Sequence, residues 1–279
     1  MSKTTALYAI SAALHKAEEF IKVNDWKANT DFQKEFLEKF FPADSESKYF
    51  TPEELESLAS TSTEEINQFL KSRGFNLELE PIPPDGFGTA GVMRVLVKWK
   101  NSGTKTFICN NDGKKFPAAS LKDISVFKVK GWPNHVAEIK CENGDKVYLT
   151  KADKDYSGFW FLPDQLMEED NFVYEMDYEI MFPFVDLNQM VDISFLESMG
   201  LGSQFEIEQA IQQTKFKMNH VGAKAESAAA IKFLRCCSMG SERLIFSEPF
   251  LIWMTREGLS MPYFVGYITE DDWKDPGEL

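Results

Sequence analysis

An alternation of apolar and polar side chains marks residues 214–221 as an extended segment. Phe216 and Met218 alternate there with Lys215 and Lys217. Successive side chains of an extended chain point to opposite faces, so this pattern predicts a strand with one buried face. We therefore expect a half-buried strand over 214–221.

A second alternation, between small and charged residues, follows at once. Lys224 and Glu226 separate the first of the small residues. The small residues are Gly222, Ala223, Ala225, Ser227 and Ala229. As a strand, this segment would have one smooth face that fits into a packed interior. Ala, Glu, Lys and Leu are also strong helix formers, so the composition leaves a surface helix over 223–235 open.

Helical spacing is most frequent in the N-terminal part of the chain. Residues 5–22 fit an amphipathic helix or a pair of strands, and 31–41 fit a short helix that Pro42 ends. Thr51-Pro52-Glu53-Glu54 combines a capping box with proline at the first helical position. We expect it to open a helix that ends before Arg73. A second capping box, Ser62 with Glu65, offers a point at which that helix would divide.

The segment 82–101 contains a glycine pattern of the form G-x-G-x-x-G, from Gly86 to Gly91. A dinucleotide-binding fingerprint needs a strand before its glycines and a helix after them. Here Pro-Pro-Asp precedes the glycines and the β-type run VMRVLVKW follows. We exclude nucleotide binding on this order and expect a strand near 92–100.

Strand patterns continue from 104 to the C-terminal part of the chain. Residues 104–152 contain several short apolar runs with turn residues at 111–113 and 143–144. Residues 153–175 are acidic and aromatic, which predicts a loop or a short helix. After Pro249 two nearly continuous apolar runs are typical of buried strands. The acidic segment from Thr269 is expected to be solvated.

Composition excludes several classes of function. The chain has 279 residues and is 43% hydrophobic, so it can bury the core of one or two domains. Its net charge of −14 argues against nucleic acid as a partner, because phosphate contacts need clustered Lys and Arg. No run reaches the roughly 18 uncharged apolar residues of a membrane span. The first residues make no convincing signal peptide, which favours a cytoplasmic or non-classically exported protein.

The sequence offers no recognisable catalytic or metal-binding motif. His15, His135 and His220 lie far apart, and no nucleophile elbow, P-loop or metalloprotease helix is present. We therefore expect no metal, no cofactor and no enzymatic activity. The four cysteines do not make a disulfide framework in a chain of this size. A redox or metal role for the adjacent pair Cys236 and Cys237, next to the cationic Arg235, is the alternative.

The C-terminal third resembles that of a serpin. The resemblance rests on the hinge GAKAESAAA (222–230), a variable segment, and then FSEPFLIWMTREG (246–258) and MPYFVGYI (261–268). Residues 64–101 are similar to the family's helix across the sheet and the central strand after it. Residues 178–187 are similar to a further strand, and 186–202 to a helix ended by Gly200 or Gly202. The resemblance also favours a strand within 5–22.

This resemblance implies an α+β fold in a single serpin-like domain, 1–279. A large, mainly antiparallel sheet would be accompanied by a second, smaller sheet or barrel and few helices. The strands near 92–100 and 214–221 would pair around the hinge. The chain departs from the family in lacking its N-terminal helices with their Ser-Pro-x-Ser motif, and in having His220 and Val221 where acidic residues are usual. We interpret it as a miniature serpin.

The resemblance also implies a function. In serpins a protease cleaves an exposed reactive-centre loop and is trapped when the hinge inserts as a new strand. The loop would span about 222–246, exposed and cut first in limited proteolysis over 231–243. The family's spacing places the cleaved bond after Cys236 when counted from the hinge glycine, and after Ser238 when counted back from Pro249. Arg235 suits a trypsin-like protease, and Cys237 lies between these candidates.

Two functions remain open at this point. The first is a monomeric inhibitor of a serine or cysteine protease. The second is a non-inhibitory binding protein that kept the serpin scaffold and lost the trap.

Overall fold

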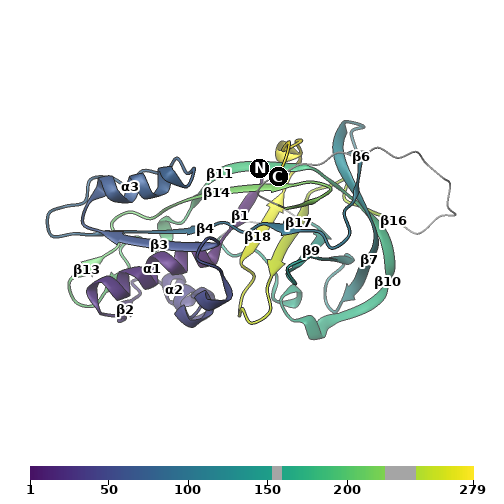
Figure 1. The fold of residues 1–279 in the computed structure, drawn as a ribbon. Helices are drawn as coiled ribbons and strands as arrows, with labels where there is room; N and C mark the ends of the chain where they lie inside the picture. Colours follow the sequence, from purple (N-terminus) through teal and green to yellow (C-terminus); the bar gives the residue numbers. More distant parts are fainter. Residues whose placement is uncertain (153–158, 224–242) are drawn as a thin grey trace.

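The computed structural model describes residues 1–152, 159–223 and 243–279, apart from the side chain of Glu169. Its largest element is a nine-stranded sheet, which occupies the right-hand part of Figure 1. The pairings in this sheet are antiparallel except that β16 runs parallel to β10. The strands in sheet order are β1 (Lys3–Thr5), β18 (Phe264–Ile268), β17 (Phe250–Thr255), β9 (Lys146–Lys151), β8 (Val136–Lys140), β7 (Lys115–Val129), β10 (Phe172–Pro183) and β16 (Arg243–Ile245), with β6 (Thr104–Cys109) also paired to β7.

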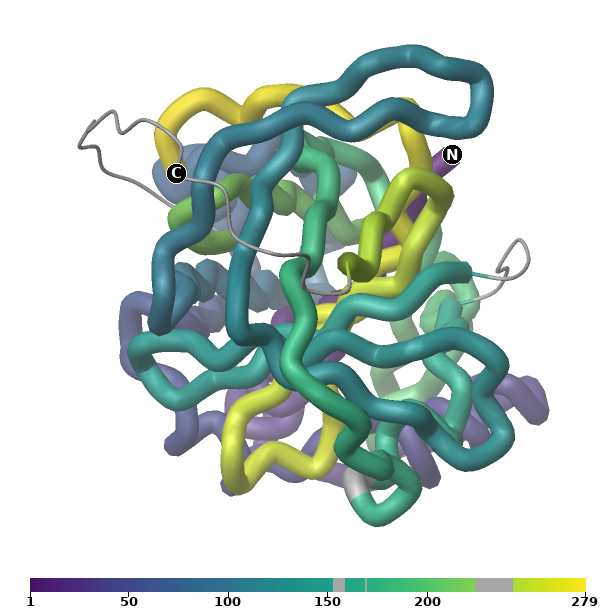
Figure 2. The backbone as a smooth tube through the Cα atoms, turned by 90° about the vertical axis from the view of Figure 1, so that its right-hand side faces the viewer, coloured from purple at the N-terminus to yellow at the C-terminus, as the bar shows by residue number. Residues whose placement is uncertain are grey.

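The expected turns of this sheet are present. Gly113 and Gly144 adopt φ angles of 79° and 92°, a left-handed conformation that glycine reaches without steric cost. Gly113 closes the hairpin between β6 and β7, which projects from the top of the molecule in Figure 2. Gly144 closes the hairpin between β8 and β9.

Smaller sheets occupy the other half of the molecule. A four-stranded sheet has the order β11 (Val185–Asp192), β14 (Ile211–Met218), β15 (Gly222–Ala223) and β5 (Val97–Lys98). Next to it, β3 (Leu55–Ser60) pairs with β4 (Gly88–Met93). A third sheet joins β13 (Phe205–Glu206), β12 (Gly200–Leu201) and β2 (Trp26–Lys27). The strands expected near 92–100 and 214–221 are present, although shorter: the end of β4 together with β5 in the first range, and β14 in the second. Gly222 and Ala223, the first two hinge residues, lie between β14 and β5, in this smaller sheet instead of the large one.

Residues 5–22, for which the sequence allowed a helix or strands, form helix α1 (Leu7–Ile21). Only residues 3–5 form a strand, β1. The favoured strand interpretation for the rest of 5–22 is wrong. Leu7, Ile10, Leu14 and Ala17 are all buried, and their spacing of three or four residues suits a helix that buries one face. Lys22 ends it in a left-handed conformation.

The other helices follow their capping residues. Helix α2 (Asp31–Glu35) begins at Thr30, whose side chain accepts a hydrogen bond from the amide of Gln33. It continues as a π-helical turn (Phe36–Phe40) up to Pro42, as expected. Helix α3 (Thr63–Ser72) is capped by Ser62 through the amide of Glu65. Five short 3₁₀ turns complete the regular structure: Asp44–Tyr49, Asp164–Leu166, Glu169–Asn171, Ser194–Leu196 and Glu270–Asp272.

The first capping box does not open a helix. Thr51 and Glu54 do exchange the two hydrogen bonds of the motif, at 2.9 and 3.3 Å. The chain then enters strand β3, so the expected helix over 52–61 is wrong. All six residues of β3 pair with β4, which satisfies the backbone groups that a helix would have satisfied internally. Long-range pairing outweighs local helix propensity here.

The helix expected over 186–202 is also absent. Residues 185–192 form β11 instead, and each of them pairs with a residue of β14. A 3₁₀ turn at Ser194–Leu196 is the only helical part of that segment. Burial on the β14 sheet again decides the conformation against the local pattern.

The acidic C-terminal segment is not simply solvated, as the sequence suggested. Trp273 and Leu279 are 3% and 6% exposed. The Trp273 ring packs edge-on against Phe116 of β7, and it also contacts Phe250 of β17. The segment is therefore docked on the protein through its few apolar residues.

Candidate functional site

The site begins where β14 ends and the hinge begins. After Met218 the chain makes a tight turn, closed by a hydrogen bond from the Asn219 amide to the Gly222 carbonyl at 2.9 Å. The Asn219 side-chain oxygen accepts from the amide of Val221 at 2.8 Å. The turn directs Gly222 and Ala223 back along β14 as the short strand β15.

Strand β15 lies between two other strands. Ala223 pairs with Met218 of β14 on one side and with Val97 of β5 on the other, antiparallel to both. Gly222 is required for this placement, because a Cβ atom there would lie 2.3 Å from the carbonyl oxygen of Val97. The small side chain of Ala223 is 2% exposed, which places the start of the hinge in the interior.

Beyond Ala223 the two flanking edges separate around a cavity. Among the described residues, β14 below Met218 pairs with β11 alone and β4 pairs with β3 alone. A cavity of about 1140 Å³ lies between these edges. It is a slot bounded by two parallel strand edges, because β14 and β5 are each antiparallel to β15. We call this cavity the slot.

Helices cover both faces of the slot (Figure 1). On the inner face α1 packs against β4 so closely that a Cβ atom on Gly91 would lie 2.0 Å from the Ala9 carbonyl oxygen. On the outer face Ile66 and Leu70 of α3 pack with Ala90 and Val92 of β4. The slot thus lies between two helical layers.

The walls of the slot differ on the two faces. Gln212, Thr214 and Phe216 of β14 point to the inner face and are buried. On the outer face Lys215 donates a hydrogen bond to the Gly74 carbonyl, and Gln213 accepts one from the Asn76 amide at 2.8 Å. The inner face is consequently buried and narrow, whereas the outer face carries charge.

Two buried polar atoms on the inner wall have no hydrogen-bond partner among the described residues. They are Thr214 Oγ1 and Gln212 Oε1. The other end of the Gln212 amide is satisfied, since Nε2 donates to the Ala6 carbonyl oxygen at 3.1 Å. A buried polar atom without a partner costs stability, so an occupant of the slot with matching polar groups would be favoured.

Comparison with solved structures identifies the architecture. The chain is similar to thyroxine-binding globulin in complex with thyroxine, with a TM-score of 0.60 and 10% sequence identity over 96% of this chain and 92% of that one. Serpin48 of the insect Tenebrio molitor gives a TM-score of 0.54 and 10% identity over 94% and 96% of the two chains. The chain has a serpin-like fold.

A third serpin, from the trematode Schistosoma haematobium, matches with a TM-score of 0.50 and 12% identity over 74% of this chain and 62% of that chain. At such identities the likeness shows the fold alone. No family model matches the sequence, and a comparison with curated proteins finds no match. The serpin-like resemblance of the hinge and C-terminal runs is thus supported by architecture, not by overall sequence similarity.

The structure describes two of the expected site residues. Gly222 and Ala223 lie at the mouth of the slot. The remaining hinge residues and the candidates for the cleaved bond lie outside the described residues: Ala225, Ser227, Ala229, Arg235, Cys236, Cys237 and Ser238. The exposed segment expected at 231–243 also falls there, apart from Arg243.

The far end of the expected reactive loop is placed. Strand β16 pairs with the edge of β10, and Arg243 Nε donates to Glu179 Oε2 at 2.7 Å. Although burial opposes the shift, hydrogen bonds from Ser120, which has the largest effect, and from Arg243 hold the pKa of Glu179 below its usual value. The segment between Ala223 and Arg243 therefore joins the slot to the edge of the large sheet.

Sequence reasoning missed the walls of the slot. Its inner helix carries alanine at Ala6, Ala9, Ala13 and Ala17, which allows a close approach to β4. This spacing next to Gly91 is a signal that was available in the sequence. It needed the knowledge that 7–21 and 88–93 are neighbours, which no local pattern provides.

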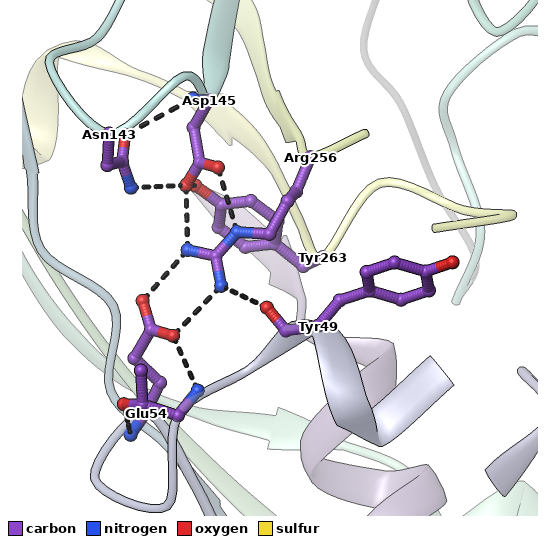
Figure 3. Close-up of polar contacts among 7 residues, drawn as sticks. Tyr49, Glu54, Asn143, Asp145, Arg256 and Tyr263 are labelled. Atoms are coloured by element: carbon purple, nitrogen blue, oxygen red, sulfur yellow. Dashed lines mark hydrogen bonds and ion pairs between the residues drawn. The ribbon is translucent and has the colours of Figure 1, made fainter. Parts of the chain in front are cut away.

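An ionic cluster connects the start of the β3–β4 strand pair to the large sheet (Figure 3). Arg256 donates to both oxygens of Asp145, at 2.8 and 2.9 Å, and to both oxygens of Glu54, at 2.8 and 2.9 Å. Tyr263 and Asn143 also donate to Asp145, at 3.0 and 2.9 Å. Glu54 stands directly before β3, so the cluster anchors the start of the β3–β4 pair.

Electrostatics in this cluster favour its charged form. Burial, the largest single effect, would raise the pKa of Glu54, but the hydrogen bonds from Arg256, the backbone hydrogen bond from Thr51 and the charge of Arg256 together lower it. Burial and the neighbouring Asp145 raise the pKa of the Tyr263 hydroxyl well above its usual value.

The remaining chemistry of the described residues is sparse. Burial raises the pKa of the Cys141 thiol to about 12, with Asp145 adding to the shift, so this cysteine is unreactive. No group of three potential metal ligands is found within residues 1–152, 159–223 and 243–279. In the same ranges no helix is long and apolar enough to cross a membrane.

Proposed function

We propose that this protein inhibits a serine or cysteine protease by loop cleavage and strand insertion. The observation that carries the proposal is the slot, a strand position that no described residue fills and whose mouth holds Gly222 and Ala223. Both flanking strands run antiparallel to β15. A strand that continued from Ala223 would therefore find hydrogen-bonding edges on both sides.

The register assigns each hinge residue to a face. Continuing the observed pairing would place Ala225 opposite Phe216 and Val95, Ser227 opposite Thr214 and Met93, and Ala229 opposite Gln212 and Gly91. These positions belong to the inner face, where α1 approaches most closely. The small residues of the hinge would thus meet the narrow, buried wall, which is what the alternation of small residues requires.

The polar groups match as well. Ser227 would bring its hydroxyl opposite Thr214 Oγ1, which has no hydrogen-bond partner among the described residues. Cross-strand hydroxyl pairs of this kind stabilise a sheet. On the outer face Glu226 would lie between Lys215 and Arg94, where opposite charges attract.

The chemical step belongs to the protease. The protease's general base takes the proton of its serine or cysteine nucleophile, which bonds to the carbonyl carbon of the residue before the cut. The C–N bond then breaks, and the leaving nitrogen takes that proton from the protonated base. Arg235, Cys236, Cys237 and Ser238 are the candidate residues before the cut. The freed hinge then inserts into the slot and pulls along the protease, which is still bonded to the cut end of the loop. The protease is distorted before water can hydrolyse that bond. This chain supplies the bait and the slot, and no catalysis.

The substitution Ala225→Arg tests insertion. It would place a long cation against Phe216, which is 7% exposed, and no acidic residue stands opposite. Burying such a charge costs roughly several kcal/mol. We expect loop cleavage to continue while covalent complexes on denaturing gels, with trypsin and papain as probes, fall at least about tenfold.

Glu226→Gln is the matched control, because it changes the neighbouring residue on the outer face without adding a cation. The alternation of small and charged residues by itself predicts that Glu226→Arg is also tolerated. The register makes it a poor control, since the new cation would face Lys215 and Arg94. Complexes that form equally well with Ala225→Arg and with the parent would contradict strand insertion.

A non-inhibitory binding protein is the second candidate. Its support is the similarity to thyroxine-binding globulin, whose structure contains bound thyroxine. The midpoint of thermal unfolding before and after a single cut between 231 and 243 separates the two functions. Insertion adds a strand and should raise the midpoint steeply, whereas a cut in a loop that stays outside the sheet leaves it nearly unchanged.

A further inference from the structure

The last seven residues, Trp273–Leu279, lie across the end of β14, and we call them the strap. Its buried residues recur at every third position: Trp273, Pro276 and Leu279. Trp273 packs on the large sheet, with its ring centroid 5.1 Å from that of Phe116 and 6.5 Å from that of Phe250. The strap is thus anchored on a different sheet from the one that contains the slot.

The other half of the strap contacts β14 and the hinge turn. Lys217 Nζ donates a hydrogen bond to the Pro276 carbonyl oxygen at 3.0 Å. Asn219 Nδ2 donates to the Gly277 carbonyl oxygen at 3.3 Å. Glu278 lines the slot itself. Gly277 has a φ of 72°, which bends the strap so that these carbonyls face the sheet.

Asn219 is the residue on which the hinge turn depends. Its amide donates to the Gly222 carbonyl and its side-chain oxygen accepts from the Val221 amide. Its own carbonyl accepts from the indole of Trp99, a residue that is 1% exposed, at 3.0 Å. The fourth polar group of Asn219, its side-chain NH₂, is the one that the strap holds.

We propose that the strap positions the hinge, holding the turn at Asn219 so that Gly222 and Ala223 stay seated between β14 and β5. The contacts between the strap and the turn are those of described residues, whereas the effect on protease trapping rests on the proposed function. Without the strap, Lys217 and Asn219 lose their acceptors on this side, and the turn gains freedom. If Gly222 and Ala223 leave the mouth of the slot, they must return to it before the hinge can insert. Insertion then becomes slower relative to hydrolysis of the acyl-enzyme, which releases the protease.

The test pairs two substitutions that change the net charge equally. Leu279→Asp puts a carboxylate at a position that is 6% exposed and should detach the end of the strap. Lys274→Ala removes one exposed positive charge from the same segment, where Lys274 contacts Asp272. The first readout needs no protease: hydrogen exchange of the Asn219 and Trp99 amides, which donate to Gly222 and Val221.

We expect exchange at both amides to accelerate about tenfold in Leu279→Asp and to stay unchanged in Lys274→Ala. Should Leu279→Asp fail to fold, Lys217→Met removes the hydrogen bond to Pro276 without burying a charge. Unchanged exchange in whichever of the two variants folds would overturn the proposal.

The second readout is the yield of covalent complex with trypsin or papain. The strap's role predicts at least a threefold loss of complex in Leu279→Asp, with a matching gain of cleaved free protein. Faster exchange with an unchanged yield would also overturn the proposal. A parent protein that traps neither protease would refute the proposed function instead, and the exchange measurement would still decide whether the strap holds the turn.

Discussion

Arg256 shows how one side chain can hold distant segments together. Its guanidinium lies between Asp145, which is 1% exposed, and Glu54, and it also donates to the Tyr49 carbonyl at 2.8 Å. The planar fork of arginine suits two bidentate carboxylates at once, which lysine cannot match. Arg256 and the residues it joins come from three separate parts of the chain, so the contact forms only in the folded state.

Removal of this guanidinium should be costly. Arg256→Met leaves Asp145 buried with only neutral partners, and we expect the free energy of unfolding to fall by about 3 kcal/mol in chemical denaturation. Arg94→Met removes a more exposed ion pair to Glu56 and serves as the control, with an expected change below about 1 kcal/mol. The double variant Arg256→Met/Asp145→Asn should lose less than the sum of its parts. Additive losses would contradict the coupling of this pair.

His220 should make stability depend on pH. Its ring stacks on Phe184, and burial lowers the imidazole pKa, with Lys105 adding to the effect and Asp275 opposing it. In the unfolded chain the ring takes up a proton near its ordinary pKa of 6.5, whereas in the folded protein it stays neutral to lower pH. The unfolded state therefore binds more protons in that interval, and folding stability falls as the pH drops below about 6.5.

Thermal midpoints of the parent and His220→Gln between pH 7.5 and 5 measure this contribution. As the pH falls, the thermal midpoint of the parent should decrease more than that of His220→Gln. A gap that is constant over this interval would show that His220 does not titrate differently in the folded and unfolded states.

At the scale of elements, the hinge strand β15 depends on backbone proximity. Gly222 sits against β5 with no room for a side chain, as the 2.3 Å distance to the Val97 carbonyl oxygen shows. Two residues of strand have few contacts with which to offset a steric clash. The mouth of the slot is therefore the least tolerant part of the four-stranded sheet.

Gly222→Ala should dislodge β15 from β5. We expect a loss of about 2 kcal/mol in unfolding free energy, together with faster hydrogen exchange at the Trp99 amide. Gly200→Ala in β12 is the control, because a Cβ atom there would meet the Lys27 Cβ atom at 3.4 Å, an ordinary contact. If both substitutions were equally harmless, the close approach of β15 to β5 would be refuted.

For the whole molecule, the architecture is similar to that of solved serpins although the sequence is not. The match to thyroxine-binding globulin extends over 96% of this chain at 10% identity. Layer packing and sheet order can be kept by many combinations of apolar residues, since volume and pattern matter more than identity. The net charge of −14 acts at the same scale, on solubility and on association with charged partners, and does not influence the fold.

The sequence by itself determined the segments whose signals are local. Side chains a few residues apart specify the strands at 214–218 and in the apolar runs of β17 and β18. Gly113 and Gly144 specify hairpin turns through their backbone conformation. The hinge motif and the C-terminal runs were enough to predict the serpin-like fold. In each case the conformation that buries the apolar side chains is also the one that the local backbone prefers.

Tertiary structure alone decided the segments in which those two preferences conflict. Residues 55–60 carry a helix-start signal before them, yet they become β3 because β4 lies alongside and pairs with all six. Residues 185–192 become β11 for the same reason, opposite β14. The slot is equally a product of assembly, since Ala9, Gly91, Thr214 and Ala223 are far apart in sequence. Contacts over such separations compete with local propensity only once the chain has folded, and a sequence pattern cannot record their outcome.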